Sequence, residues 1–206
     1  MLNSKNIPKE VSRVTSTLET AGFEAYLVGG CVRDLLLART PRDWDITTNA
    51  NPEEILNLFE HTFYENSFGT VGIVSDETSD ETLKNIEVTP YRLEGAYSDS
   101  RHPDEVVFSD KLEDDLKRRD FTVNAMAYNV SHETLVDLYK GQEDLNNKII
   151  KTVGNPDDRF KEDALRILRA VRFTTELNFN IESETQKSII KFAEKLENIS
   201  KERIRD

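Results

Sequence analysis

Two short stretches near the N-terminus hold residues that could bind phosphate and metal. The glycine pair Gly29-Gly30 ends an apolar run and precedes Arg33, and Asp43 and Asp45 follow two positions apart. Glycine lets the backbone approach a ligand closely, and the amides that open a helix favour phosphate. Residues i and i+2 of a strand point to one face, so both carboxylates could share Mg²⁺. The combination predicts nucleotidyl transfer.

Simpler interpretations exist for each residue taken alone. An Asp-x-Asp pair is common on surface strands. Here the glycine turn upstream favours the metal-binding interpretation. The turn matches neither the dinucleotide-binding fingerprint nor the P-loop, so those two classes lose support. We expect Asp34 to pair with a nearby arginine rather than bind metal. We expect Cys31 to be a packed side chain rather than a thiol activated at a helix start.

Glu87 is a lone acid between Ile86 and Val88 on a predicted strand. A third carboxylate on a neighbouring strand could complete the metal site or act as the base for a 3′-hydroxyl. A solvent-facing glutamate would give the same pattern, so both interpretations stay open.

An acid and three arginines recur every third residue in a helical pattern: Asp163, Arg166, Arg169 and Arg172. With 100° per residue they sweep half of the helix circumference, and apolar residues take the other half. An aspartate and an arginine one turn apart could hydrogen-bond the edge of a base. The alternative is a salt bridge on a solvated face.

The composition describes a charged, acidic chain. The 206 residues carry a formal net charge of −12, which argues against a broad nucleic-acid-binding surface. Basic residues cluster at 117–119 and along the arginine series, which suggests a pocket for a small polyanion or ordinary ion pairs. The chain has no long apolar run, no signal-peptide core and a single cysteine. We therefore expect a cytoplasmic protein without a disulfide, a structural zinc site or a membrane partner.

Hydrophobic periodicity divides the chain into two parts. Strands dominate up to about residue 140 and helices after about 157, which predicts an α/β domain over 1–145 and a helical domain over 146–206. Asn49 or Asn51 could cap the helix that starts at Pro52. The last residues resemble the start of a helix, so we expect a chain truncated before further domains. The expected helices cover 8–21, 32–37, 52–59, 163–173 and 184–196, and the expected strands 23–28, 44–47, 69–74 and 85–91.

Several longer motifs resemble one family, in order and over nearly the whole chain. LVGGCVRDLLL with DWDIT resembles the first motif of class II tRNA nucleotidyltransferases, the CCA-adding enzymes, which share an ancestor with bacterial poly(A) polymerases. Four further segments are similar to the family's later motifs: Arg118–Asn129, Asp137–Leu145, Glu162–Phe173 and Ile199–Ile204.

The resemblance implies a polymerase-β-like α/β (α+β) head with a mixed sheet, followed by an all-α neck and, in longer members, by body and tail domains. Asp43 and Asp45 would bind the catalytic Mg²⁺, and Asp163 with Arg166 would act as a protein template for the incoming base. The other implied nucleotide contacts are Gly29, Gly30, Arg33, Arg119, Asp120, Asn124, Arg169 and Arg172. The tRNA 3′-hydroxyl would attack the α-phosphate of CTP or ATP and release pyrophosphate.

Two loops bear on the exact product. Residues 91–101 resemble the lever loop that the family needs to switch from C to A, which disfavours CC-only addition. Residues 67–71 resemble the H-G-T-V of CCA-type enzymes more than the G-R-R-F of poly(A) polymerases, although Phe68 replaces His and Ala38 replaces a usual Gly. We therefore expect CCA addition. A-only addition, poly(A) addition and a nucleotide- or tRNA-binding module without turnover remain alternatives, and a monomer is favoured.

Overall fold

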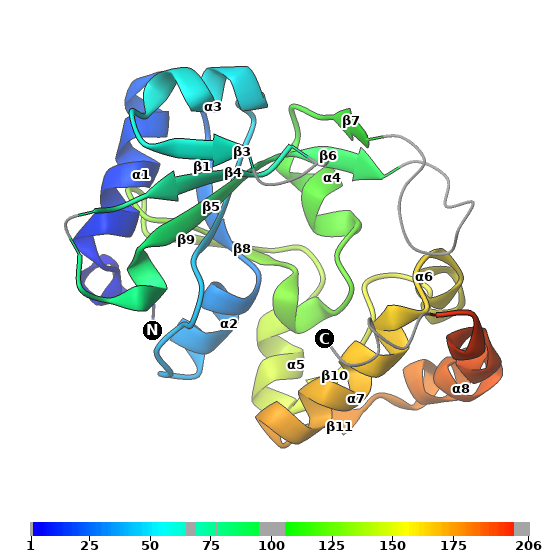
Figure 1. The fold of residues 1–206 in the computed structure, drawn as a ribbon. Coiled ribbons are helices and arrows are strands. Elements are labelled where there is room, and N and C mark those ends of the chain that lie inside the picture. Colours follow the sequence, from blue (N-terminus) through cyan, green and yellow to red (C-terminus); the bar gives the residue numbers. More distant parts are fainter. Residues whose placement is uncertain (1, 65–68, 77, 95–105, 200–206) are drawn as a thin grey trace. The chain divides into compact units, whose positions relative to one another are not determined.

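The computed structural model describes residues 2–64, 69–76, 78–94 and 106–199 (Figure 1). Its contacts divide the chain into two compact units, each built from several segments. The sheet unit comprises 1–93, 108–116 and 126–138, and the helical unit comprises 94–107, 117–125 and 139–206. The sequence predicts a single boundary, after residue 145. In the structure, by contrast, the short segments 94–107 and 117–125 belong to the helical unit although segments of the sheet unit follow them in the chain.

The sheet unit is built on a seven-stranded mixed sheet with the strand order β3-β4-β5-β2-β1-β8-β9. β2 and β5 run parallel, and the other neighbouring pairs are antiparallel. β6 (Arg92–Glu94) and β7 (Val106–Phe108) form a separate two-stranded sheet. The strands of the large sheet are β1 (Ala25–Val28), β2 (Asp45–Thr48), β3 (Thr62–Tyr64), β4 (Val71–Val74), β5 (Asn85–Pro90), β8 (Met126–Asn129) and β9 (Thr134–Asp137).

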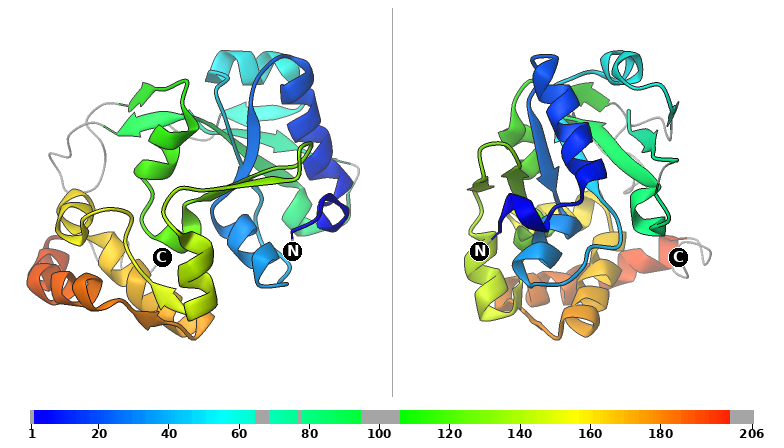
Figure 2. Two further views of the ribbon diagram at one scale, coloured as in Figure 1. Left: turned by 180° about the vertical axis from the view of Figure 1, so that it is seen from behind. Right: turned by 90° about the vertical axis from the view of Figure 1, so that its left-hand side faces the viewer.

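Helices cover the apolar face of this sheet. α1 (Lys9–Thr20) buries Val11, Val14 and Leu18, the spacing from which a helix is predicted, and it contacts β1 and α3 (Figures 1 and 2). These side chains join one core cluster with the sheet residues Leu27 and Ile46. The remaining helices of this part are α2 (Gly30–Leu36), α3 (Pro52–Leu58) and α4 (Leu112–Lys117), with short 3₁₀ turns at Ser4–Asn6 and Glu81–Leu83.

Asn51, not Asn49, caps α3. Its side chain accepts the amide of Glu54 at 2.9 Å, and the Glu54 carboxylate accepts the amide of Asn51 at 2.8 Å. This reciprocal pair is a capping box, with Pro52 at the first helical position. Asn49 instead accepts the amide of Glu24 at 2.7 Å, which ties the start of β1 to the end of β2.

The opposite face of the sheet carries the polar residues. Ile46 and Val88 are buried Cα partners in β2 and β5, and the next pair along is Asp45 with Glu87. Because side chains alternate along a strand, Asp45 and Glu87 point away from the core. The polar face of the sheet therefore holds two of the predicted carboxylates in register.

The helical unit packs its helices around Phe160 and Ile150, both fully buried. A short parallel pair, β10 (Ile149–Ile150) and β11 (Asn180–Ile181), adds a strand element to a region expected to be all helical. The predicted helices over 163–173 and 184–196 are confirmed as α7 and α8, with shifted ends. The elements are α5 (Gly141–Asn147), α6 (Pro156–Glu162), α7 (Leu165–Leu177) and α8 (Ser183–Phe192), with 3₁₀ turns at Thr122–Asn124 and Ala193–Asn198.

The predicted fold class, an α/β head with a mixed sheet before a mainly helical segment, is confirmed. Within the ranges described above, every helix is too short or too polar to span a membrane.

Candidate functional site

The glycine pair makes a turn that only glycine adopts easily. Gly29 ends β1 with φ 79° and ψ −134°, and its carbonyl accepts the amide of Arg33 at 3.2 Å. A side chain at this φ would be strained. α2 starts directly at Gly30, two residues earlier than predicted, so Arg33 is its fourth residue and belongs to its last turn.

Gly30 lies directly beside two predicted site residues. A Cβ atom at this position would lie 3.6 Å from Nη2 of Arg33 and 3.9 Å from Oδ1 of Asp43. Arg33 is buried and forms an ion pair with Asp34, its Nη2 lying 2.8 Å from Oδ1. The expected pairing of Asp34 is thus confirmed. The structure brings together Gly30, Arg33 and Asp43.

Asp43 and Asp45 flank the buried Trp44. Trp44 is in the core cluster, so the carboxylates on either side of it turn away from the core; Asp43 is exposed in the bend before β2, and Asp45 is half-buried. The charges of both aspartates also affect the Cys31 thiol, which donates to the carbonyl of Val28 at 3.2 Å. Burial, and then the charges of Asp45 and Asp43, raise the pKa of Cys31 to about 12. Cys31 is therefore a packed, protonated side chain, as expected.

The carboxylate pair suits a magnesium ion held partly by substrate. Among the residues that the structure describes, no group of three or more His, Cys, Asp or Glu side chains could hold a metal ion. Glu87 lies opposite Asp45 in register, and its part in a metal site stays a prediction. Magnesium commonly binds through one or two carboxylates plus substrate phosphates, and Asp43 with Asp45 fit that pattern. The role of Glu87 as a base stays a prediction.

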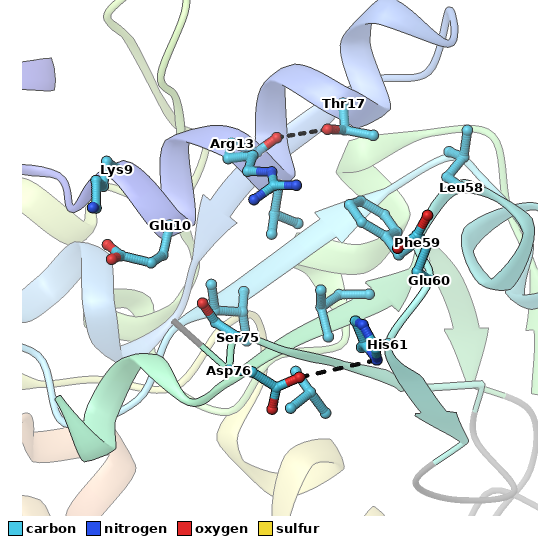
Figure 3. A pocket seen from close by; sticks show the side chains of 14 residues that line it. Lys9, Glu10, Arg13, Thr17, Leu58, Phe59, Glu60, His61, Ser75 and Asp76 are labelled. Atoms are coloured by element: carbon cyan, nitrogen blue, oxygen red, sulfur yellow. Dashed lines mark hydrogen bonds and ion pairs between the residues drawn. The ribbon is translucent and has the colours of Figure 1, made fainter. Parts of the chain in front are cut away.

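A cavity elsewhere in the sheet unit holds none of the predicted residues. It has a volume of about 600 Å³ and lies between α1, the end of α3 and the end of β4 (Figure 3). His61 and Asp76 approach each other there to 4.0 Å. Its lining mixes acids with Lys9 and Arg13, so it offers no single charge to a ligand.

The two glycines should respond differently to alanine. Gly29→Ala should lower the free energy of unfolding by about 1–3 kcal/mol because it forces an L residue into a strained φ. Gly30→Ala should leave stability unchanged or raise it by up to about 1 kcal/mol, because alanine favours a helix. Its methyl group would narrow the space beside Arg33, so the KM for nucleoside triphosphate should rise about tenfold, as for one lost charge-assisted hydrogen bond. Urea unfolding and steady-state kinetics measure the two effects, and equal stability loss in both variants would contradict this assignment.

In the helical unit, Asp163 lies between two helices rather than within one. It ends α6 with φ −141° and ψ 109°, and its Oδ1 accepts the amide of Leu165 at 2.9 Å. The predicted single helix from residue 163 is therefore wrong at its start, because an aspartate carboxylate competes for amides at a helix end. Burial raises the pKa of Asp163, although the amide of Leu165 and the charge of Arg166 act against it.

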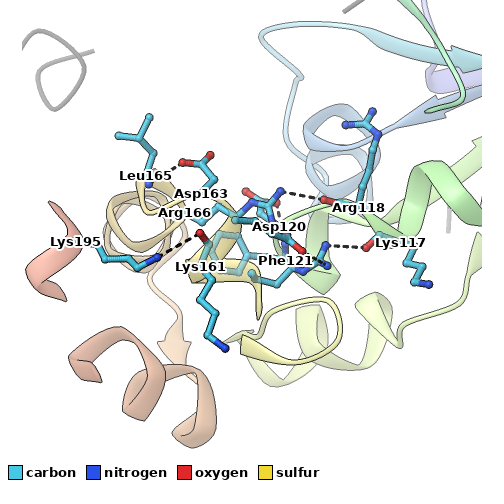
Figure 4. A network of polar contacts seen from close by, with 11 residues as sticks. Lys117, Arg118, Asp120, Phe121, Lys161, Asp163, Leu165, Arg166 and Lys195 are labelled. Atoms are coloured by element: carbon cyan, nitrogen blue, oxygen red, sulfur yellow. Dashed lines mark hydrogen bonds and ion pairs between the residues drawn. The ribbon is translucent and has the colours of Figure 1, made fainter. Parts of the chain in front are cut away.

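Arg166 is held in a fixed position by its neighbours. It is only 7% exposed, and its Nη1 donates to Oε2 of Glu162 at 2.7 Å. Its Nη2 donates to the carbonyl of Arg118 at 3.2 Å (Figure 4). The other oxygen of Glu162 accepts Nη2 of Arg159 at 2.7 Å. Arg166 thus forms an ion pair, but a buried one rather than the expected pair on a solvated face, and the same contacts set the orientation of its guanidinium group.

Asp120 is the centre of a second polar group. Its Oδ2 accepts Nε of Arg169 at 2.7 Å, and its Oδ1 accepts the amide of Phe121 and, at 3.3 Å, the side chain of Asn124. Burial alone would raise the pKa of Asp120, but the charge and hydrogen bond of Arg169 outweigh it and lower that pKa. Arg169 also lies 5.4 Å from the ring of Phe173. Asp120 and Arg169 belong to separate sequence motifs, so the spacing of residues within each motif does not predict their ion pair.

The remaining predicted residues lie at the edges of this region. Arg119 is half-buried directly before Asp120, and the exposed Arg172 pairs with Glu176 at 3.1 Å, one helical turn away. The predicted lever segment lies mostly outside the described residues, as do Ser67 and Phe68. Its first residue, Tyr91, is fully buried and donates to the Glu24 carboxylate at 2.9 Å.

A mixed sheet with a carboxylate pair on its polar face, followed by a mainly helical segment, defines the nucleotidyltransferase head class. The poly A polymerase head domain family matches residues 25–151, and the chain belongs to this family. Residues 178–206 also match the family described as "Probable RNA and SrmB- binding site of polymerase A".

Named relatives and solved structures point the same way. The chain is 51% identical over 194 residues to a CCA-adding enzyme of Lactobacillus helveticus, a match that covers 94% of this chain and 47% of the relative. For the Enterococcus faecalis CCA-adding enzyme, identity is 47% over 197 residues, covering 95% and 47%. The Bacillus stearothermophilus CCA-adding enzyme in complex with CTP superposes with a TM-score of 0.84 at 39% identity, covering 96% of this chain and 47% of that one. The chain thus spans about half the length of the relatives it matches.

Proposed function

We propose that this chain is the catalytic part of a tRNA nucleotidyltransferase that adds C, C and A to the tRNA 3′ end from CTP and ATP. The observation that carries the proposal is the carboxylate pair, Asp43 and Asp45, of which Asp43 lies beside Gly30 and Arg33. The relatives support it, since the proteins at 47–51% identity bear the name CCA-adding enzyme.

The residues of the sheet unit would serve the phosphates and the attacking group. Arg33 would neutralise the triphosphate across the space that Gly30 leaves, and Asp43 with Asp45 would hold Mg²⁺. When bound, the ion would activate the 3′-hydroxyl and stabilise the leaving pyrophosphate. The hydroxyl oxygen bonds to the α-phosphorus as the bond to pyrophosphate breaks, and its proton leaves to a base. Glu87, in register with Asp45, is our candidate for that base.

The residues of the helical unit would choose the nucleotide. Asp163 can accept hydrogen bonds from a base amino group, and Arg166 can donate to ring nitrogens and carbonyls. The contacts of Arg166 with Glu162 and Arg118 fix its direction before a base arrives. Such preorganisation favours selective recognition. Arg119, Asp120, Asn124, Arg169 and Arg172 would support the bound nucleotide.

One incorporation experiment tests the proposal. The chain is incubated with Mg²⁺ and tRNAs ending before CCA, after the first C or after CC, with CTP and ATP supplied singly and together. We expect C, C and A in turn, with no incorporation when EDTA removes the metal. A alone on the CC-ended tRNA would indicate an A-adding enzyme, and long A tails a poly(A) polymerase. Binding of CTP without transfer would leave only a nucleotide-binding module.

A further inference from the structure

The ring of Phe63, in the edge strand β3, covers a glycine of the neighbouring strand β4. Phe63 in β3 and Gly72 in β4 are Cα partners, and a Cβ atom at Gly72 would lie 2.3 Å from Cζ of Phe63. The ring therefore lies directly over the glycine, in space that a side chain there would need. Phe63 is still 40% exposed, so part of the ring remains open to solvent.

This ring lies in the same cross-strand row as the candidate catalytic residues. Gly72 is the Cα partner of Glu87, and Glu87 is the Cα partner of Asp45. Directly opposed residues of a sheet point to the same face. Neighbouring strands are about 4.8 Å apart, so a ring over β4 lies about 10 Å from β2, which carries Asp45.

We propose that Phe63 is a stacking platform for a base at the 3′ end of the acceptor RNA. The inference rests on the proposed function, which brings the terminal 3′-hydroxyl to Asp45. At about 10 Å the ring is too far to touch the reacting phosphorus and close enough for the terminal or the preceding base. Aromatic rings stack on every base without reading its identity. Stacking therefore suits an acceptor whose last base changes with each addition. Hydrogen bonds to one particular base would not suit it.

Fluorescence of a terminal base tests this directly. A tRNA minihelix with 2-aminopurine as its last nucleotide is titrated with the parent chain and with Phe63→Tyr, Phe63→Leu and Gly72→Ala. We expect quenching by the parent and by Phe63→Tyr, and loss of quenching in Phe63→Leu. Gly72→Ala should act like Phe63→Leu, because its new Cβ displaces the end of the ring. In incorporation assays the KM for RNA should rise about tenfold with an unchanged KM for CTP.

Tyr64 supplies the matched control. It is the next residue, 53% exposed, and its partner Val71 is buried in the core, so its side chain leaves β3 on the other face. Tyr64→Leu should quench and incorporate like the parent, and urea midpoints verify that each variant folds.

Two results would overturn the inference, and a third would overturn the proposed function instead. If Phe63→Leu quenched and incorporated like the parent, the ring would not contact the RNA, and the proposed function would stand. If the parent incorporated nothing, the proposed function would fail, and quenching would still decide the role of Phe63. If Phe63→Leu changed only the sedimentation of the protein, the ring would cover a second copy at the edge strand instead.

Discussion

Asp45→Asn is expected to lower nucleotide incorporation at least about a thousandfold. A bound metal ion supplies several kcal/mol of transition-state stabilisation, and about 4 kcal/mol corresponds to three orders of magnitude in rate. Asparagine keeps the size of the side chain, so β2 should keep its pairing with β1 and β5. The measurement is the single-turnover rate of CMP addition, together with a Mn²⁺ titration followed by electron paramagnetic resonance. We expect the affinity for Mn²⁺ to fall with the rate.

Asp76→Asn is the matched control for this prediction. It removes the same charge from the same unit, and its side chain is 69% exposed just after β4. Its rate and Mn²⁺ affinity should equal those of the parent. An Asp45→Asn variant that incorporated nucleotide at the parental rate would contradict the assignment, and so would a tight Mn²⁺ site that both variants retained.

The N-terminal part of the sheet unit could be predicted because its signals are local, whereas β3, β8 and β9 were not among the expected strands. The spacing of Val11, Val14 and Leu18 fixes one face of α1, and Pro52 marks the first turn of α3. The glycine pair and the two aspartates lie close in sequence, so their juxtaposition follows from one strand, one turn and one helix. Cys31 and Asp34 behave as expected for the same reason.

Three features could not be predicted, two because they depend on distant partners and one because a periodic pattern conceals it. The Asp120–Arg169 ion pair joins residues 49 positions apart, and the spacing of residues along the sequence does not indicate it. The break at Asp163 arises because its carboxylate accepts the Leu165 amide, a local competition that the three-residue period conceals. The ring of Phe63 covers Gly72 because of the strand register, which the three-residue β3 segment does not indicate in sequence.

Arg166→Ala is expected to reduce base selection more than it weakens triphosphate binding. A well-placed arginine contributes about 1–3 kcal/mol of discrimination between bases, which corresponds to about ten- to a hundredfold. The ratio of kcat/KM for CTP over UTP, and for ATP over GTP, should fall by that factor. The dissociation constant for CTP should change by less, because the phosphates would be bound by residues of the sheet unit.

The contacts of Arg166 also stabilise the folded protein, so its alanine variant should lose stability as well as base selection. The control is therefore a variant that loses a similar amount of stability. Arg159 donates to the other oxygen of the same Glu162 carboxylate, also at 2.7 Å. Each arginine variant removes one hydrogen bond to a charged group, which costs about 1.5–3 kcal/mol in the free energy of unfolding. Arg159→Ala should therefore lower the urea midpoint comparably and leave the CTP-to-UTP ratio at the parental value. If Arg159→Ala lost selection equally, a loosened Glu162 would explain both variants, and Arg166 would not be the template residue.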